Sequence, residues 1–146
     1  MIIEGSCELK TSLDKTWEYI IDPAKIGKCL PDLKSLNVES ENKFTAVIRV
    51  GVGPIRSEFK FRIEITGKEP PHRVQLKAVG SGSGSNVNID VAIDIKEVLG
   101  GCQLVYKADV KIGGMMAGLG QRVIMDAASK TVASVFSCIK REIEQA

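Results

Sequence analysis

Apolar and polar residues alternate along five stretches of the chain between residues 44 and 112, and this period of two constrains the fold more than any other feature. Successive side chains of a β-strand point to opposite faces, so the pattern is typical of strands that bury one face. The five stretches are residues 44–52, 59–65, 74–78, 87–95 and 102–112. Turn residues separate them, and no helical pattern lies between them. We therefore predict an antiparallel sheet of consecutive strands with one covered face.

Two further strands and two short helices are predicted before and around the first of these stretches. The strands would cover residues 2–10 and 35–39, which makes about seven in all. Ser12 has the side chain of a helix N-cap, and Asp14 places a negative charge at the positive end of the helix dipole. This first helix would end at Asp22-Pro23, and a second helix, residues 24–30, would end before Pro31.

A long amphipathic helix is predicted for the C-terminal segment, which follows Gly113-Gly114 and contains no proline up to Ala146. Apolar residues recur there at intervals of three to five, as on one face of a helix. A helix of about thirty residues is ~45 Å long, enough to lie across the whole concave face of a curved sheet. The pattern therefore predicts an α+β fold, in which a seven-stranded curved antiparallel sheet wraps around a long C-terminal helix.

Composition limits the class of protein further. The 146 residues fit one domain, residues 1–146. Twenty Lys and Arg against 18 Asp and Glu give a net charge of +2, too balanced for a protein that binds nucleic acid through its phosphates. The N-terminus does not resemble a signal peptide, and no apolar run is long enough to span a membrane, so we expect a cytoplasmic protein.

The cysteines and the single histidine do not form a metal-binding pattern. The four cysteines have no paired spacing, and a zinc site needs two close pairs of ligands. In a reducing cytosol we expect all four as buried or half-buried thiols. No metal and no cofactor are expected.

The predicted helix and sheet suggest a cavity, because a sheet curves and a helix does not. Small residues mark the start of the predicted helix and leave that end thin: Gly113, Gly114, Ala117, Gly118 and Gly120. Met115 and Met116 beside them are adaptable liners. A dry pocket at this end would suit a hydrophobic ligand. The alternative interpretation is that the glycines allow close helix–sheet packing or a hinge.

The order of the predicted elements resembles the helix-grip fold of the START-like superfamily, which includes pollen-allergen relatives and polyketide cyclases. Within it, the sequence is most similar to the G-subunit family of carbon monoxide dehydrogenase. The matching strings are Asp22-Pro23 with Cys29-Leu30-Pro31, residues 50–55 (Val-Gly-Val-Gly-Pro-Ile), and Gly113-Gly114 followed by residues 119–124 (Leu-Gly-Gln-Arg-Val-Ile). Together they span essentially the whole chain.

The resemblance implies a cytoplasmic accessory protein that holds a quinone- or lipid-like molecule in a cavity. Its implied partner is a molybdenum hydroxylase of the carbon monoxide dehydrogenase type, and its implied place of action is the inner face of the membrane. Many members carry a C-terminal extension that can tether them to the membrane, whereas this chain stops at Ala146. We therefore expect at most transient membrane contact.

Candidate catalytic groups are few, which favours a protein without catalysis over an enzyme. His72 lies in a Pro-Pro-His-Arg turn, and Cys29 has no histidine near it in sequence. Asp90 and Asp94 fall on the outward register of their strand. The Gly/Ser segment 80–85 leads into a strand rather than a helix, so we expect a mobile loop there, not a phosphate cradle.

Three functions remain open at this point: a carrier or sensor of a hydrophobic molecule, a cyclase- or hydrolase-like enzyme of the same fold, and a docking module for a larger oxidoreductase. Trp17 could stack on a ligand or belong to the core, and the phenol of Tyr106 could reach a ligand carbonyl. We expect the ligand-binding residues to be Trp17, Ile26, Leu30, Phe59, Phe61, Ile89, Tyr106, Met115, Met116, Leu119 and Val123.

Overall fold

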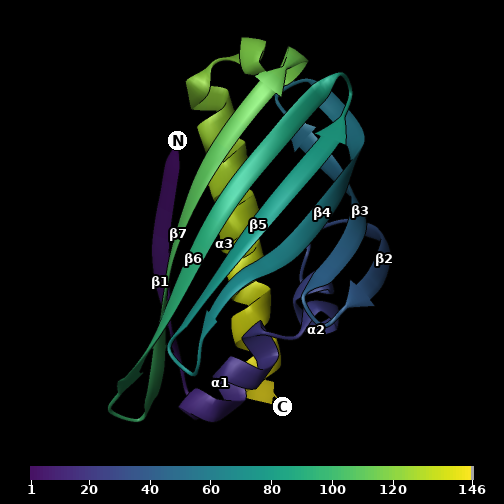
Figure 1. Ribbon diagram of the computed structural model, residues 1–146. Coiled ribbons are helices and arrows are strands. Elements are labelled where there is room, and N and C mark those ends of the chain that lie inside the picture. The colour runs from purple at the N-terminus through teal and green to yellow at the C-terminus, as the bar shows by residue number, and fades with distance from the viewer. Residues whose placement is uncertain (146) are drawn as a thin grey trace.

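A curved antiparallel sheet wraps around one long helix in the computed structural model, which describes residues 1–145 (Figure 1). The elements in chain order are β1 (Ile2–Leu9), α1 (Leu13–Ile20), α2 (Pro23–Gly27), β2 (Leu33–Ser40), β3 (Lys43–Val52), β4 (Ile55–Glu69), β5 (Arg73–Gly82), β6 (Ser85–Val98), β7 (Gly101–Gly114), the 3-10 helix η1 (Met115–Leu119) and α3 (Gln121–Gln145). The expected α+β architecture is confirmed.

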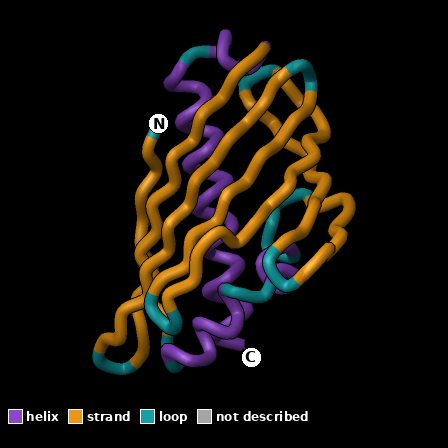
Figure 2. The backbone as a smooth tube through the Cα atoms, in the orientation of Figure 1, coloured by secondary structure: helices purple, strands orange, loops and turns teal. Residues whose placement is uncertain are grey.

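The seven strands found in residues 1–145 have the order β1-β7-β6-β5-β4-β3-β2, and every neighbouring pair is antiparallel. Strands β2 to β7 form a meander joined by short connections (Figure 2). Strand β1 adds to the far edge beside β7, with Ile2 opposite Asp109. None of the helices among these residues is long and apolar enough to cross a bilayer.

The two short helices are set by their capping residues. Ser12 Oγ accepts a hydrogen bond from the Lys15 amide at 3.2 Å, as expected of the N-cap of α1. Asp22, expected only to help end the first helix, also caps α2 by accepting from the Ala24 amide at 3.0 Å. The expected extent of the second helix, residues 24–30, is wrong. It ends at Gly27, and separate turns continue the chain to Leu30.

The long C-terminal helix begins later than the sequence predicts. We expected it directly after Gly113-Gly114, but Gly114 and Gly120 both have positive φ, 81° and 91°, a region that glycine adopts without strain. The five residues between Gly114 and Gly120 therefore form η1, and α3 starts at Gln121. With 25 residues, α3 is about 37 Å long rather than ~45 Å.

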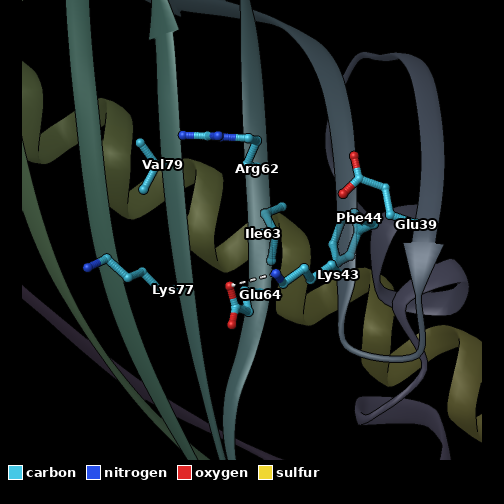
Figure 3. Close-up of a pocket in the computed structure, with 8 residues that line it drawn as sticks. All are labelled: Glu39, Lys43, Phe44, Arg62, Ile63, Glu64, Lys77 and Val79. Atoms are coloured by element: carbon cyan, nitrogen blue, oxygen red, sulfur yellow. Dashed lines mark ion pairs between the residues drawn. The ribbon is translucent and has the colours of Figure 1, made fainter.

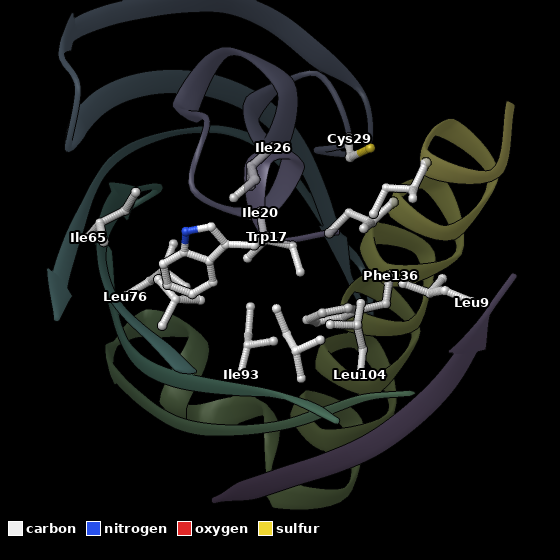
Figure 4. Packing of buried hydrophobic residues seen from close by; sticks show 14 of the residues in the cluster. Leu9, Trp17, Ile20, Ile26, Cys29, Ile65, Leu76, Ile93, Leu104 and Phe136 are labelled. Carbon is white, nitrogen blue, oxygen red and sulfur yellow. The ribbon is translucent and has the colours of Figure 1, made fainter. Parts of the chain in front are cut away.

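The inward residues of the strands and the apolar face of α3 form the core. One cluster lies around α1 and the second half of α3, where Trp17, Ile20, Leu104 and Phe136 pack together (Figure 4). A second cluster lies at the other end of the grip, and Met116 and Ile124 belong to it. The inward register predicted for the strands is confirmed.

A disulfide joins Cys29 to Cys138, so the expectation of four thiols is wrong for these two residues. Their Cα atoms are 5.5 Å apart although 109 positions separate them in sequence. The spacing of the cysteines contained no hint of this contact, because the packing of the turn after α2 on α3 creates it. Cys7 and Cys102 are free thiols.

The Gly/Ser segment 80–85 is a tight β-hairpin turn rather than the expected mobile loop. Strand β5 runs to Gly82, β6 starts at Ser85, and these two residues are paired. The two residues between them have φ of 49° (Ser83) and 67° (Gly84). Positive φ at both central positions is the signature of the type I′ turn that joins two-residue hairpins.

A substitution in this turn should make the protein more stable. Asparagine tolerates positive φ better than serine, so Ser83→Asn should raise the free energy of unfolding by about 0.5 kcal/mol in urea denaturation. Gly84→Ala, which places a Cβ in the same region, should lower it by about 1 kcal/mol. A loss of stability in Ser83→Asn would contradict the turn assignment.

Candidate functional site

An apolar cavity of about 170 Å³ lies between the concave face of the sheet and the second half of α3. The strands β3 to β7 supply its floor, and α3 forms a wall. The residues after α1 close it from above: Ile26 and Leu30 reach in from α2 and the turn that follows it, and we call residues 23–30 the roof segment. The lining residues are Ile26, Leu30, Phe44, Ile48, Phe61, Ile63, Leu76, Ala78, Ile89, Val91, Ile93, Ala108, Thr131, Val132, Val135, Phe136 and Ile139.

The wall of the cavity follows from helical spacing. Thr131, Val135 and Ile139 recur every four residues on α3, and Val132 and Phe136 lie beside them, so all five share one face of the helix. Ile139 and Phe136 are buried, whereas Thr131 is exposed although it also lines the cavity. The cavity therefore reaches the surface along α3 near Thr131.

The cavity lining offers a ligand no free side-chain hydrogen-bond donor. Thr131 carries the one hydroxyl in the lining, and its Oγ1 donates to the Ala127 carbonyl at 2.9 Å. All the other lining residues are apolar. An apolar lining of this kind suits hydrocarbon rather than a polar group.

The residues expected to bind ligand fall into two sets. Ile26, Leu30, Phe61 and Ile89 line the cavity together. The other seven do not line it. Trp17 packs in the core around α1, and Phe59 and Met116 belong to the cluster at the opposite end of the grip. Leu119 packs against that same cluster, and Met115 and Val123 are exposed.

Tyr106 lies behind the wall rather than in it. Its ring stacks on that of Phe136, with centroids 3.8 Å apart and planes 4° apart, and Phe136 faces the cavity. The phenol oxygen lies over Gly5 of β1, so close that a Cβ at this position would collide with it. Burial, aided by the nearby Cys7, raises the pKa of Tyr106, so the phenol keeps its proton at neutral pH.

The cavity is not at the glycine-rich end where the sequence placed it, because that end is closed. Met116 is only 2% exposed, and its amide donates to Ser85 Oγ at 2.9 Å, which fixes η1 over the end of the sheet. Sequence reasoning missed most of the wall, including Val132, Val135 and Ile139. The helical spacing of these apolar residues was the signal in the sequence that could have indicated the wall.

The candidate catalytic groups lie away from the cavity. His72 Nδ1 is 3.1 Å from the Ile95 carbonyl, and Asp94 forms an ion pair with Arg73 at 2.8 Å on the outer face. Cys29 is in the disulfide.

A separate polar depression of about 290 Å³ also lies on the outer face, around Arg62 and the 3.9 Å ion pair of Lys43 with Glu64 (Figure 3). Its charged side chains are those of a solvated sheet face.

Comparisons with known proteins agree with this architecture. The family model for the G subunit of carbon monoxide dehydrogenase (CoxG) matches residues 5–144. No curated protein matches the sequence. A conserved protein from Geobacillus kaustophilus has a crystal structure with a TM-score of 0.89 and 30% identity, over 99% of this chain and 96% of that one.

More distant structures share the fold. The Zhui aromatase/cyclase from a Streptomyces species has a TM-score of 0.72 at 11% identity, over 99% of this chain and 94% of that one. A START superfamily protein from Mycobacterium smegmatis has a TM-score of 0.70 at 10% identity, over 99% and 97% of the two chains. The chain therefore has the START-like helix-grip fold.

Filling the cavity should cost the fold little. Ala78 lies on the cavity floor, so Ala78→Ile adds carbon atoms to empty space, and the free energy of unfolding should stay within about 1 kcal/mol of wild type in urea denaturation. Ala92→Ile makes the same change on the outer face of β6 and serves as the control. A loss of more than about 2 kcal/mol in Ala78→Ile alone would indicate a packed site.

Proposed function

Because the chain belongs to the CoxG family, the G subunits of carbon monoxide dehydrogenase, we propose that it binds the apolar part of a quinone- or lipid-like molecule in the cavity between the sheet and α3. The observation that carries the proposal is the wholly apolar lining around Phe61, Ile89 and Val135. In this role the protein is a carrier or accessory protein without catalytic groups of its own.

The size of the cavity supports a particular mode of binding. A cavity of about 150 Å³ holds one benzene ring, so the 170 Å³ here accepts a single ring or a short stretch of hydrocarbon chain. A larger ligand must leave the rest of its structure outside. Because the lining has no free donor and only the Thr131 oxygen as a side-chain acceptor, the hydrocarbon enters and the polar head stays in solvent near Thr131.

The cellular role extends this proposal. We infer that the protein delivers its ligand to, or receives it from, a molybdenum hydroxylase of the carbon monoxide dehydrogenase type, as the name of the family suggests. A quinone dissolves in the bilayer, so such a carrier would act in the cytoplasm with transient contacts to the membrane. A docking role on the hydroxylase is compatible with this exchange.

A cyclase- or hydrolase-like activity is the weaker alternative. The Zhui aromatase/cyclase shares the fold, but fold alone does not carry chemistry. Such reactions need a positioned acid or base, and no titratable side chain is among the lining residues.

Binding can be tested with undecanoic acid that carries a bromine atom at the far end from the carboxylate. The bromine is about the size of a methyl group and quenches the fluorescence of Trp17, which packs in one cluster with the cavity-lining Ile26 and Phe136. We expect saturable binding to the wild type and displacement by a short-chain menaquinone analogue or by an unlabelled fatty acid, whichever the cavity prefers. Ala78→Ile should weaken binding by about tenfold or more because it occupies the same space, while Ala92→Ile should not. Equal binding by wild type and Ala78→Ile would count against the cavity as the site.

A further inference from the structure

The boundary of the cavity differs between the two sides of α3. We call the side where α3 faces the roof segment and β3 the seam, because among the described residues hydrogen bonds hold α3 only on the opposite side. On the other side, Lys140 Nζ donates to the Glu8 carbonyl at the end of β1, and Glu144 Oε2 accepts from the Lys10 amide at 3.0 Å. Within residues 1–145, no hydrogen bond joins α3 to α2 or to β3.

Two contacts limit this seam along the helix. At its upper end, the β3–β4 turn lies close to α3, with room for little more than a methyl group between Gly53 and the Val123 side chain. At its lower end, the Cys29–Cys138 disulfide binds the turn after α2 to the helix. The two contacts are fifteen residues apart on α3, about 22 Å, and the exposed Thr131 lies between them.

The disulfide is also the direct link between the roof segment and the wall. Cys29 lies between Ile26 and Leu30, which both line the cavity, and Cys138 precedes Ile139, which lines it from the other side. Figure 4 shows Cys29 beside α3, with Ile26 near the interior. The roof segment also packs against α1, β2 and β3, and the disulfide is the bond that fixes it to α3.

We propose that the Cys29–Cys138 disulfide is a redox-operated latch on the cavity: the oxidised form holds the roof segment on α3, and reduction releases it and speeds the exchange of ligand. The latch regulates the site of the proposed function and rests on that function for its purpose. Disulfides of proteins in reducing compartments are usually transient or redox-sensing, which suits this role.

The chemistry requires a dithiol reductant of the thioredoxin class. Cys29 is buried, whereas Cys138 is half-buried, so a reductant thiolate attacks Cys138 Sγ and the Cys29 sulfur leaves as a thiolate. The second thiol of the reductant then displaces Cys138 from the mixed disulfide. In total two electrons and two protons pass to the chain, which gains two thiols, and the reductant leaves as its own disulfide.

Tyr19 is placed to assist the leaving group. Its Oη is 3.5 Å from Cys29 Sγ and 3.3 Å from the Lys25 carbonyl, so the phenol can turn its hydrogen bond to the new thiolate. Burial, together with the carboxylates of Glu142 and Asp22, raises the pKa of Tyr19, which keeps the phenol protonated as a donor. Tyr19→Phe should slow reduction of the disulfide by dithiothreitol about threefold to tenfold.

The first test needs no ligand. Hydrogen–deuterium exchange should be slow in the oxidised protein at the Lys28, Cys29 and Leu30 amides, which are hydrogen-bonded within the roof segment. Reduction by a phosphine, or the substitution Cys138→Ser, should speed this exchange at least about fivefold. The exchange of the β6 amides, which lie in the centre of the sheet, should not change and serves as the control. Equal protection in both redox states would overturn the latch, as would alkylation of Cys29 and Cys138 in the oxidised protein without prior reduction.

The second test measures the consequence for ligand. The dissociation rate of the bromine-labelled undecanoic acid should rise about tenfold or more in reduced wild type, Cys29→Ser and Cys138→Ser. Cys7→Ser keeps the disulfide and should behave as oxidised wild type. Equal rates in all forms would overturn the gating of exchange. Absence of binding in every form would instead overturn the proposed function, while the amide exchange still decides whether the roof segment is latched.

Discussion

A straight helix cannot stay in contact with a curved sheet along its whole length, and the cavity of this protein lies where α3 and the sheet are furthest apart. At one end, Met116 and Ile124 fill the space between η1, α3 and the sheet. At the other, Ile143 packs into the core, and Glu144 binds the Lys10 amide. Fixed at both ends, the helix spans the bowed middle of the sheet, and the roof segment covers the space that remains.

The local elements could be predicted from the sequence because local rules set them. The period of two predicted the strands and which of their side chains face inward, and Ser12 as an N-cap residue predicted the start of the first helix. The start of α3 was predicted too early because the small apolar residues of η1 continue the helical pattern, and only the positive φ of Gly120 breaks it. The position of the cavity and the partner of Cys29 could not be predicted, since both depend on where the turn after α2 meets a helix whose Cys138 is 109 positions away in sequence.

An apolar cavity sets limits on selectivity. Such a site distinguishes ligands that differ by one methylene by only ~1–3 kcal/mol, and its lining has no free hydrogen-bond donor with which to recognise a head group. Selection among related molecules therefore falls to shape within the cavity and to whatever the head group meets outside, near Thr131. If the cavity binds hydrocarbon as proposed, it accepts a range of chain structures, and finer discrimination has to come from contacts outside it.

The place of β1 in the sheet also affects how the chain is made. Residues 2–9 are synthesised about a hundred residues before residues 102–109 of β7, which are their strand partner in the part of the chain that the structure describes. Until β7 is made, β1 has no neighbouring strand. Once β7 has paired with β6, its other edge stays open until β1 pairs with it. Pairing across so long a stretch of chain is slow, so the pairing of β1 with β7 is a late step of folding, and the edges of both strands are open to other chains until it is complete.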